Sequence, residues 1–240
     1  MKRFLPIAIV LGMLFSMTAC GASSADAPQS SQRTAAETPA AGTPAVEASQ
    51  AEPEAADQSQ PEEKTSGSRI LVIYFSRTGE QYSVGVIEKG NTAIVAEMIA
   101  EETGADLYEV IPADDHYPST YKELTDVGMQ EQREHARPAI GKDLPDVSDY
   151  ETIFVGSPVW WGDWPMIMYT LFESLDLNGK TLIPFSTHGG SGLSGFDRSL
   201  AAAFPTSEVL KGLAVAGTDA QNKQDDVRSR VQNWIAELGI

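Results

Sequence analysis

The sequence predicts an α/β fold, in which residues 69–240 form a doubly wound, five-stranded parallel sheet with helices on both faces. From Arg69 onward, short apolar runs alternate with stretches of helical periodicity, a pattern typical of repeated β-α units. The first run, Ile-Leu-Val-Ile-Tyr-Phe at residues 70–75, is unbroken and rich in branched side chains. Such a run indicates a parallel strand that is buried on both faces.

The remaining elements follow in order along the chain. Further strands are predicted at residues 107–111, 152–155, 181–185 and 209–216. Asn91 or Thr92 is expected to cap a first helix that ends near Gly104, and Pro165 to be the first residue of another. The last helix has apolar residues at core-facing spacing, namely Val227, Val231, Trp234, Ile235 and Leu238. In such sheets ligands bind at the carboxyl ends of the strands, beside the topological switch point.

The loop after the first strand has the composition of a phosphate site. It reads Ser76-Arg77-Thr78-Gly79, continues through an insert at residues 80–89, and reaches Asn91-Thr92-Ala93 at the start of the first helix. Hydroxyls and free backbone N–H groups at a helix N-terminus bind phosphate without a lysine. The alternative, and the commoner role, is that Thr78, Asn91 and Thr92 only cap a turn and a helix. Nucleotide hydrolysis is not indicated, because the sequence has no Gly-x-x-x-x-Gly-Lys-Ser/Thr run.

Two later loops add flat and flexible surfaces at the same sheet edge. The loop after the third strand contains Pro158-Val159-Trp160-Trp161-Gly162, followed by Trp164, and offers a platform for a planar ring. At least one of the three tryptophans is expected to pack into the core instead. The loop after the fourth strand reads Thr187-His188-Gly189-Gly190-Ser191-Gly192, and its glycines let backbone approach a flat ligand. Its Gly-x-Gly-x-x-Gly pattern is not a dinucleotide fingerprint, because that motif follows a first strand.

The first of these loops resembles the phosphate loop of the flavodoxins, a Ser/Thr-x-Thr-Gly-Asn-Thr run, which is split here by residues 80–89. The resemblance covers residues 69–240 and implies the strand order 2-1-3-4-5 and the cofactor FMN. The Gly-rich fourth loop is similar to that of a flavodoxin-like branch often found in secreted and lipid-anchored proteins. The cofactor-binding residues implied are Ser76, Arg77, Thr78, Gly79, Asn91, Thr92, Ala93, Pro158, Val159, Trp160, Trp161, Gly162, Thr187, His188, Gly189, Gly190 and Gly192, with Trp161 favoured as the neighbour of the flavin ring.

Other polar and aromatic residues supply secondary candidates. His188 is the candidate catalytic residue, since an imidazole donates a hydrogen bond or carries a proton near neutral pH; the alternative is a structural hydrogen bond. Tyr117 and Tyr121 follow the second strand and are candidates for the border of the pocket, although tyrosines at such junctions usually only pack there. No His/Cys cluster indicates a metal site.

The N-terminal part predicts export and a lipid anchor. Lys2 and Arg3 precede an apolar run at residues 4–17, so residues 1–19 are interpreted as a signal peptide. Met17-Thr18-Ala19-Cys20 resembles a bacterial lipobox, which implies lipidation of Cys20, the only cysteine; ordinary cleavage after Ala19 is the alternative. Residues 20–68, rich in Ala, Pro, Ser and Glu, are expected to form a disordered acidic tether. These features predict an extracytoplasmic protein that contacts the membrane through its lipid only.

The composition and the absence of certain motifs exclude some classes of function. The formal net charge of −17 argues against nucleic-acid binding, and no Gly-x-Ser-x-Gly elbow supports hydrolysis. The resemblance implies an FMN-dependent oxidoreductase that passes electrons to a quinone or another small acceptor outside the membrane. The alternatives are a one-electron carrier for a protein partner and, third, a flavin-free binding module. The electron donor, the use of a nicotinamide and the oligomeric state are not encoded in any recognisable motif.

Overall fold

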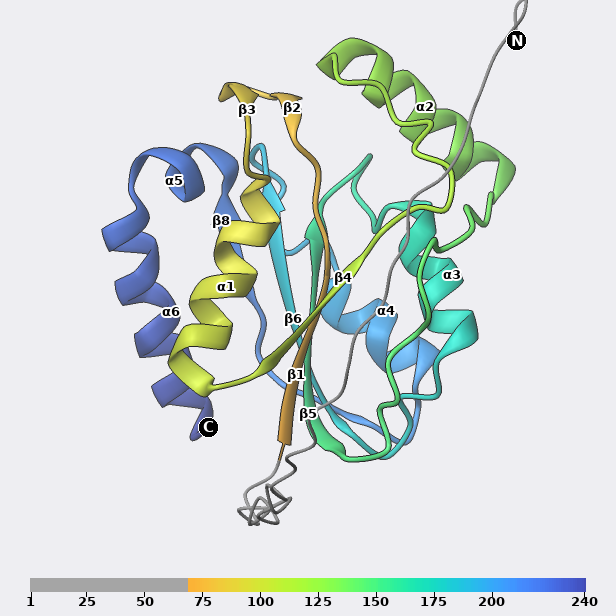
Figure 1. Ribbon diagram of the computed structural model, residues 1–240. Helices are drawn as coiled ribbons and strands as arrows, with labels where there is room; N and C mark the ends of the chain where they lie inside the picture. Colours follow the sequence, from red (N-terminus) through yellow and green to blue (C-terminus); the bar gives the residue numbers. More distant parts are fainter. Residues whose placement is uncertain (1–68) are drawn as a thin grey trace, which may run out of the picture. The chain divides into compact units, whose positions relative to one another are not determined.

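The computed structural model describes residues 69–240; the predicted signal peptide, the predicted lipidation site Cys20 and the predicted tether up to residue 68 lie outside the described residues. These described residues form three layers, with a central sheet between two groups of helices (Figure 1). The strands are β1 (Arg69–Phe75), β4 (Asp106–Val110), β5 (Tyr150–Pro158), β6 (Thr181–His188), β7 (Glu208–Val209) and β8 (Leu213–Ala216).

The sheet has the order β4-β1-β5-β6-β7, with β8 also paired to β6, and all of these pairs are parallel. Counting β7 and β8 as one interrupted strand, this is the order 2-1-3-4-5, so the predicted fold class and strand order are confirmed. The switch point lies between β1 and β5, because the chain leaves β1 toward β4 and returns on the other side.

The prediction of one continuous strand over residues 209–216 is wrong. β7 ends at Val209 and pairing resumes only where Leu213 meets Phe185 of β6. The interruption lies opposite Pro184, which has no N–H to donate to a neighbouring strand. Gly212 lies beside Pro184 at this interruption, so close that a Cβ on Gly212 would be 2.6 Å from the Pro184 carbonyl oxygen.

Helices cover both faces of the sheet. One face carries α1 (Asn91–Thr103), α5 (Gly217–Asn222) and α6 (Gln224–Leu238), and the other carries α3 (Met166–Ser174) and α4 (Phe196–Ala203), with α2 (Tyr121–Glu134) beside α3 (Figure 1). β1 shows why two cores form: Val72 and Tyr74 pack toward α1, whereas Leu71, Ile73 and Phe75 pack into the opposite cluster. Each such fully buried apolar side chain contributes roughly 1.5–3 kcal/mol.

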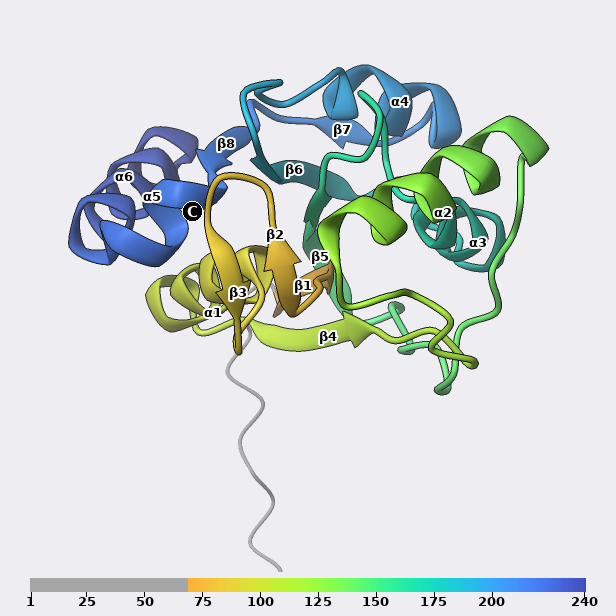
Figure 2. The same cartoon turned by 90° about the horizontal axis from the view of Figure 1, so that it is seen from above.

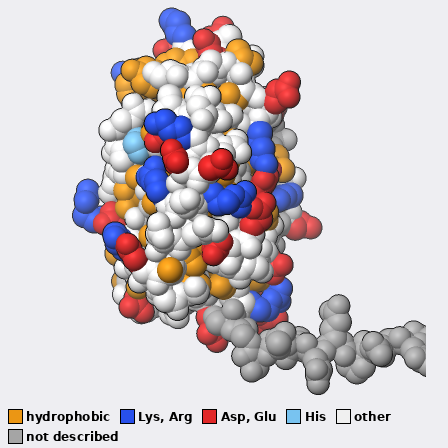
Figure 3. Space-filling view, turned by 90° about the vertical axis from the view of Figure 1, so that its left-hand side faces the viewer, with side chains coloured by type: hydrophobic (Ala, Val, Ile, Leu, Met, Phe, Trp, Pro, Cys, Tyr) orange, Lys and Arg blue, Asp and Glu red, His pale blue; other side chains and the backbone are white. Residues whose placement is uncertain are grey.

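Charged side chains on the outer face of α6 and α1 are mixed in sign rather than segregated (Figure 3). Arg228 of α6 pairs with Glu101 of α1, and Lys211 pairs with Glu237 at 2.9 Å. Exposed pairs of this kind contribute little to stability. No helix within residues 69–240 is long and apolar enough to cross a bilayer.

Candidate functional site

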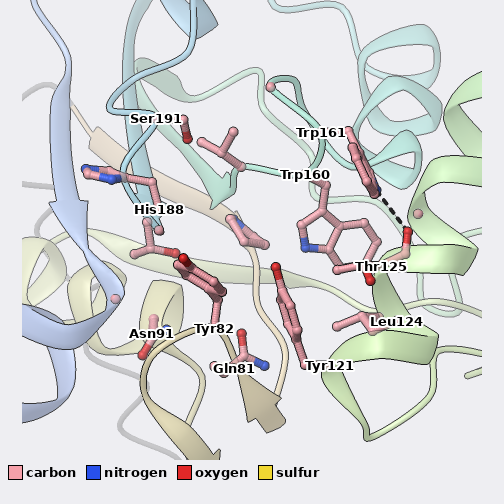
Figure 4. Close-up of a pocket in the computed structure, with 17 residues that line it drawn as sticks. Gln81, Tyr82, Asn91, Tyr121, Leu124, Thr125, Trp160, Trp161, His188 and Ser191 are labelled. Atoms are coloured by element: carbon pink, nitrogen blue, oxygen red, sulfur yellow. Dashed lines mark hydrogen bonds between the residues drawn. The ribbon is translucent and has the colours of Figure 1, made fainter.

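A cleft of about 420 Å³ opens at the carboxyl ends of β5 and β6, where the topology predicts a ligand (Figure 4). It is lined by Gln81, Tyr82, Asn91, Tyr121, Leu124, Thr125, Gly128, Pro158, Val159, Trp160, Trp161, Gly162, Thr187, His188, Gly189, Ser191 and Gly217. None of these residues is a lysine, an arginine or a carboxylate. The described part of this cleft is therefore a neutral site in a strongly acidic chain.

The start of α1 lies beside the cleft, and the residue that caps it is distant in sequence. Gly90 is the N-cap and offers no side chain, so the prediction that Asn91 or Thr92 caps the helix is wrong. The Ser76 hydroxyl oxygen accepts the Ala93 N–H instead, at 3.1 Å. A Cβ on Gly90 would be 2.1 Å from that oxygen and 2.7 Å from the Arg77 carbonyl oxygen. The loop after β1 thus folds directly onto the helix N-terminus, where the helix dipole favours an anion.

Two hydrogen bonds, one between hydroxyl groups and one between side-chain amides, attach the start of α1 to neighbouring elements. The Thr92 and Thr187 hydroxyl oxygens lie 2.7 Å apart and share a buried hydrogen bond that joins α1 to the end of β6. The Asn91 side-chain oxygen accepts a hydrogen bond from the Gln221 amide at 2.9 Å. These contacts hold Asn91 in the cleft lining while the Thr92 side chain is turned into the protein.

The tryptophan loop contains a tight turn that projects one indole outward. Trp160 and Asp163 exchange both backbone hydrogen bonds, and the two residues between them, Trp161 and Gly162, have φ values of 51° and 80°. Positive φ at both central positions defines a type I′ turn. The left-handed conformation costs a non-glycine residue roughly 1–2 kcal/mol. Trp161 nevertheless occupies it, with 52% of its surface exposed and its indole N–H donating to the Thr125 carbonyl of α2 at 2.9 Å (Figure 4).

This strain can be measured with two variants that both remove the indole. Trp161→Gly is expected to be more stable than Trp161→Ala by about 1 kcal/mol, because glycine adopts φ of 51° without a Cβ penalty. Urea unfolding followed by circular dichroism measures the difference. Equal stabilities of the two variants would show that the turn relaxes and that Trp161 is not strained.

The other two tryptophans pack inward to different extents. Trp164 is 1% exposed and stacks on Phe196 with ring centroids 3.5 Å apart, so at least one of the three is a core residue, as predicted. Trp160 forms the floor of the cleft: its ring meets Phe75 and Tyr117 edge-on, and Gly128 of α2 leaves room for it. Trp161 is the exposed member of the trio.

The insert at residues 80–89 builds one wall. It forms a short antiparallel hairpin of β2 (Gly79–Gln81) and β3 (Gly85–Ile87). The hairpin projects beyond the carboxyl ends of the strands, at the same end of the sheet as α2 (Figures 1 and 2). Tyr82 at its turn packs near Tyr121 of α2, with ring centroids 5.6 Å apart. A Cβ on Gly189 would be 2.6 Å from the Tyr82 ring, so the glycine makes room for that tyrosine. Of the two tyrosine candidates, Tyr121 lines the cleft and Tyr117 is buried beneath it.

The segment between β4 and α2 is tied to the loop after β1 and to α2. Arg77 donates to the Asp115 carboxylate at 2.6 Å and to the Tyr117 carbonyl at 3.0 Å, so its guanidinium points out of the cleft. His116 Nε2 lies 2.8 Å from the buried Glu131 carboxylate, which also accepts the Tyr117 hydroxyl at 3.1 Å. The hydrogen bond to Glu131 raises the pKa of His116 above its usual 6.5. These contacts position the segment that leads into Tyr121.

The His116–Glu131 pair is expected to make a pH-dependent contribution to stability. Because the folded-state pKa of His116 is raised, its contribution is fully present below the unfolded-state pKa of 6.5 and is lost as the pH rises through the folded-state value. The His116 side chain is 41% exposed, so the effect is expected to stay below about 1 kcal/mol. Urea unfolding should show His116→Gln less stable than the unaltered chain near pH 5.5 and nearly equal to it near pH 9. A gap that is the same at both pH values would contradict this role.

His188 lies at the cleft, but its ring does not face the aromatic side chains. Its Nδ1 accepts the Gly190 N–H at 3.0 Å, which leaves the neutral ring's proton on Nε2. Figure 4 shows the ring directed away from Trp160 and Tyr82. Burial lowers the pKa of His188, and the charge of Arg230 lowers it further. The imidazole is therefore neutral at pH 7 and held by its own loop.

The structure separates the predicted site residues into two groups. Those that line the cleft are Asn91, Pro158, Val159, Trp160, Trp161, Gly162, Thr187, His188 and Gly189. Those that lie in the supporting loops and helix start are Ser76, Arg77, Thr78, Gly79, Thr92, Ala93, Gly190 and Gly192. Sequence reasoning missed Gln81, Tyr82, Leu124, Thr125, Gly128, Ser191 and Gly217. The sequence did contain an indication for Gln81 and Tyr82, because both belong to the insert at residues 80–89, which interrupts the predicted phosphate loop and so lies next to it in the chain. Within residues 69–240, no cluster of His, Cys, Asp or Glu is arranged for a metal.

Comparisons with known proteins agree with the fold described above. The flavodoxin family model matches residues 69–237. A candidate flavoprotein from Bacteroides uniformis is 32% identical, with a TM-score of 0.55 and alignment over 71% of this chain and 99% of that one. One from Bacteroides eggerthii is 28% identical, with a TM-score of 0.53 over 72% and 99%. A Lactobacillus acidophilus flavoprotein in complex with FMN shares 20% identity and the fold, with a TM-score of 0.50 over 66% and 99%.

No curated protein is similar to the chain. The match of the family model extends over most of the sequence, and it includes the loop after β1, the tryptophan loop and the Gly-rich loop after β6. The chain belongs to the flavodoxin family.

Proposed function

We propose that the protein binds FMN in this cleft and acts as an oxidoreductase that passes electrons to a small acceptor. The observation that carries the proposal is that an aromatic cleft and a helix N-terminus, whose N-cap residue Gly90 has no side chain, meet at one sheet edge of a flavodoxin-family chain. The Lactobacillus acidophilus relative, which contains FMN, shares this fold.

The described residues fit an FMN molecule in size, shape and charge. A volume of about 420 Å³ lies in the usual range of ligand pockets, roughly 300–1,000 Å³. Trp160 and Trp161 offer flat surfaces for a planar ring system. The cradle formed by Ser76, Gly90 and the start of α1 suits a phosphate, because backbone N–H groups and the helix dipole stabilise an anion there without a cationic side chain.

The parts of the cofactor are assigned to different residues. The loop from Ser76 to Gly79 and the start of α1 hold the phosphate, while the tryptophan loop and the backbone of residues 187–189 border the ring. Bound FMN supplies electron transfer, and the chain supplies binding, orientation and exclusion of water. The neutral His188 ring holds its loop in place through Gly190, which supports a structural role for this histidine.

The electron acceptor is proposed to be a small molecule, and the site of action to lie outside the membrane. The hairpin wall with Tyr82 and Tyr121 favours a small acceptor, such as a quinone, over a protein partner that would need a bare flavin edge. The apolar run at residues 4–17 and Cys20 support an extracytoplasmic site of action with a lipid anchor. The electron-carrier alternative predicts instead that only a protein partner reoxidises the flavin efficiently.

A comparison of FMN with riboflavin, which lacks the phosphate, tests the binding site. Purified protein is expected to retain flavin absorption bands through desalting and to bind FMN at least about tenfold more tightly than riboflavin, as measured by quenching of flavin fluorescence. A folded protein that retains no FMN would overturn the proposed function. Equal affinities for FMN and riboflavin would overturn the phosphate assignment.

A further inference from the structure

We infer that the β2–β3 hairpin creates a second subsite, formed by Tyr82, Tyr121 and Trp161, that binds a neutral planar aromatic molecule beside the flavin. This inference rests on the proposed function and names the substrate class of that site. It concerns an equilibrium binding step, so it is testable without turnover.

The exposed aromatic side chains of the described residues are all gathered here. Tyr82, Tyr121 and Trp161 are the aromatic residues within residues 69–240 that expose more than about a third of their surface, at 55%, 37% and 52%. They come from the hairpin, from α2 and from the loop after β5, and all three line the one cleft. Figure 4 shows Tyr82 and Tyr121 on the opposite side of the cleft from Trp161. Three exposed rings around one cavity indicate a site for flat ligands.

Backbone contacts hold these rings in place rather than leaving them on mobile loops. The Glu80 N–H donates to the Ser119 carbonyl at 2.7 Å, and the Glu80 carboxylate accepts the Tyr121 N–H at 2.9 Å. Gly79 fits this junction because a Cβ there would lie 2.7 Å from the Ser119 carbonyl oxygen. On the other side, the indole N–H of Trp161 is bonded to the Thr125 carbonyl. A subsite whose walls are already ordered binds a rigid ligand with little entropy cost.

The chemistry of the lining selects for a neutral ligand. The cleft has no charged side chain, whereas the whole chain has a formal net charge of −17 that repels anions. A charged ligand would lose its hydration here without gaining an ion pair. The Gln81 amide and the Ser191 hydroxyl lie on the cleft wall and are able to donate to carbonyl oxygens. A quinone-type molecule, flat and neutral with two carbonyl acceptors, matches these features.

Menadione, an oxidised quinone, is a suitable probe because it does not react with oxidised flavin. Its binding to the protein can therefore be measured at equilibrium. The full chain loaded with FMN is titrated with menadione by calorimetry, and the FMN dissociation constant is measured separately for each variant. Tyr82→Ala and Tyr121→Ala are each expected to weaken menadione binding at least about tenfold while changing the FMN dissociation constant less than about threefold. Tyr82→Phe keeps the ring and should bind menadione like the unaltered chain.

The matched control is Val86→Ala, on the same hairpin but outside the cleft lining and 83% exposed, which should leave menadione binding unchanged. A negatively charged naphthoquinone sulfonate should bind at least about tenfold more weakly than menadione. Unchanged menadione binding in Tyr82→Ala, with FMN bound, would overturn the subsite alone. A parallel loss of FMN and menadione affinity would also overturn it, since Tyr82 would then be a wall of the flavin site. Failure of the unaltered chain to bind FMN would instead overturn the proposed function.

Discussion

Gly90→Ala is expected to weaken FMN binding at least about 100-fold, the largest effect of any single methyl group at this site. The new Cβ would lie 2.1 Å from the Ser76 hydroxyl oxygen, 2.7 Å from the Arg77 carbonyl oxygen and 3.0 Å from the Arg77 nitrogen. Two of these three atoms belong to the backbone, so no side-chain rotation relieves the overlap. The loop after β1 must move away from the start of α1, and the phosphate cradle is lost.

The expected cost in stability is smaller, about 1–3 kcal/mol, as for other overpacked sites. Fluorescence titration with FMN and urea unfolding measure the two effects on the same protein. Gly179→Ala is the matched control, because Gly179 has a φ of +75° and open space around it, in the turn that precedes β6. It should lose about 1–2 kcal/mol of stability and bind FMN normally. Near-normal FMN affinity in Gly90→Ala would contradict the cradle.

Trp164→Ala is expected to lower the free energy of unfolding by about 3–5 kcal/mol. Its indole is 1% exposed, stacks on Phe196 and meets Phe172 edge-on at 5.3 Å. The indole N–H also donates to the Ser199 hydroxyl at 2.6 Å, so the substitution leaves a cavity and removes a partly buried hydrogen bond. Urea unfolding followed by circular dichroism measures the loss.

Trp161→Ala gives the contrast, because Trp161 is half exposed and sits in a strained conformation. It should cost less than about 1.5 kcal/mol while weakening binding in the cleft. Trp164→Ala, measured where it remains folded, should bind FMN normally, since Trp164 does not line the cleft. Similar stability losses in the two variants would show that exposure does not separate the structural tryptophan from the ligand-facing one.

The fold was largely predictable because its strands are buried on both faces. An unbroken branched run such as residues 70–75 fits no exposed element, and β1 indeed has Val72, Ile73 and Phe75 fully buried. The break after Val209 was not predictable from local pattern, because its cause is Pro184 on the neighbouring strand. The cap of α1 was misassigned for the same reason: the capping oxygen belongs to Ser76, on a loop that meets Gly90 only in the folded chain.

The sequence by itself determined the fold class, the strand order through its family resemblance, and the three loops that meet at the carboxyl edge of the sheet. Motif order suffices there, because parallel strands bring all their C-terminal loops to one edge. Only the tertiary structure decided which side chains face the cleft. It turned Arg77 toward Asp115, buried the Thr92 hydroxyl against Thr187, and folded the insert so that Tyr82 meets Tyr121. Those outcomes depend on partners distant in sequence, which no local pattern of residues encodes.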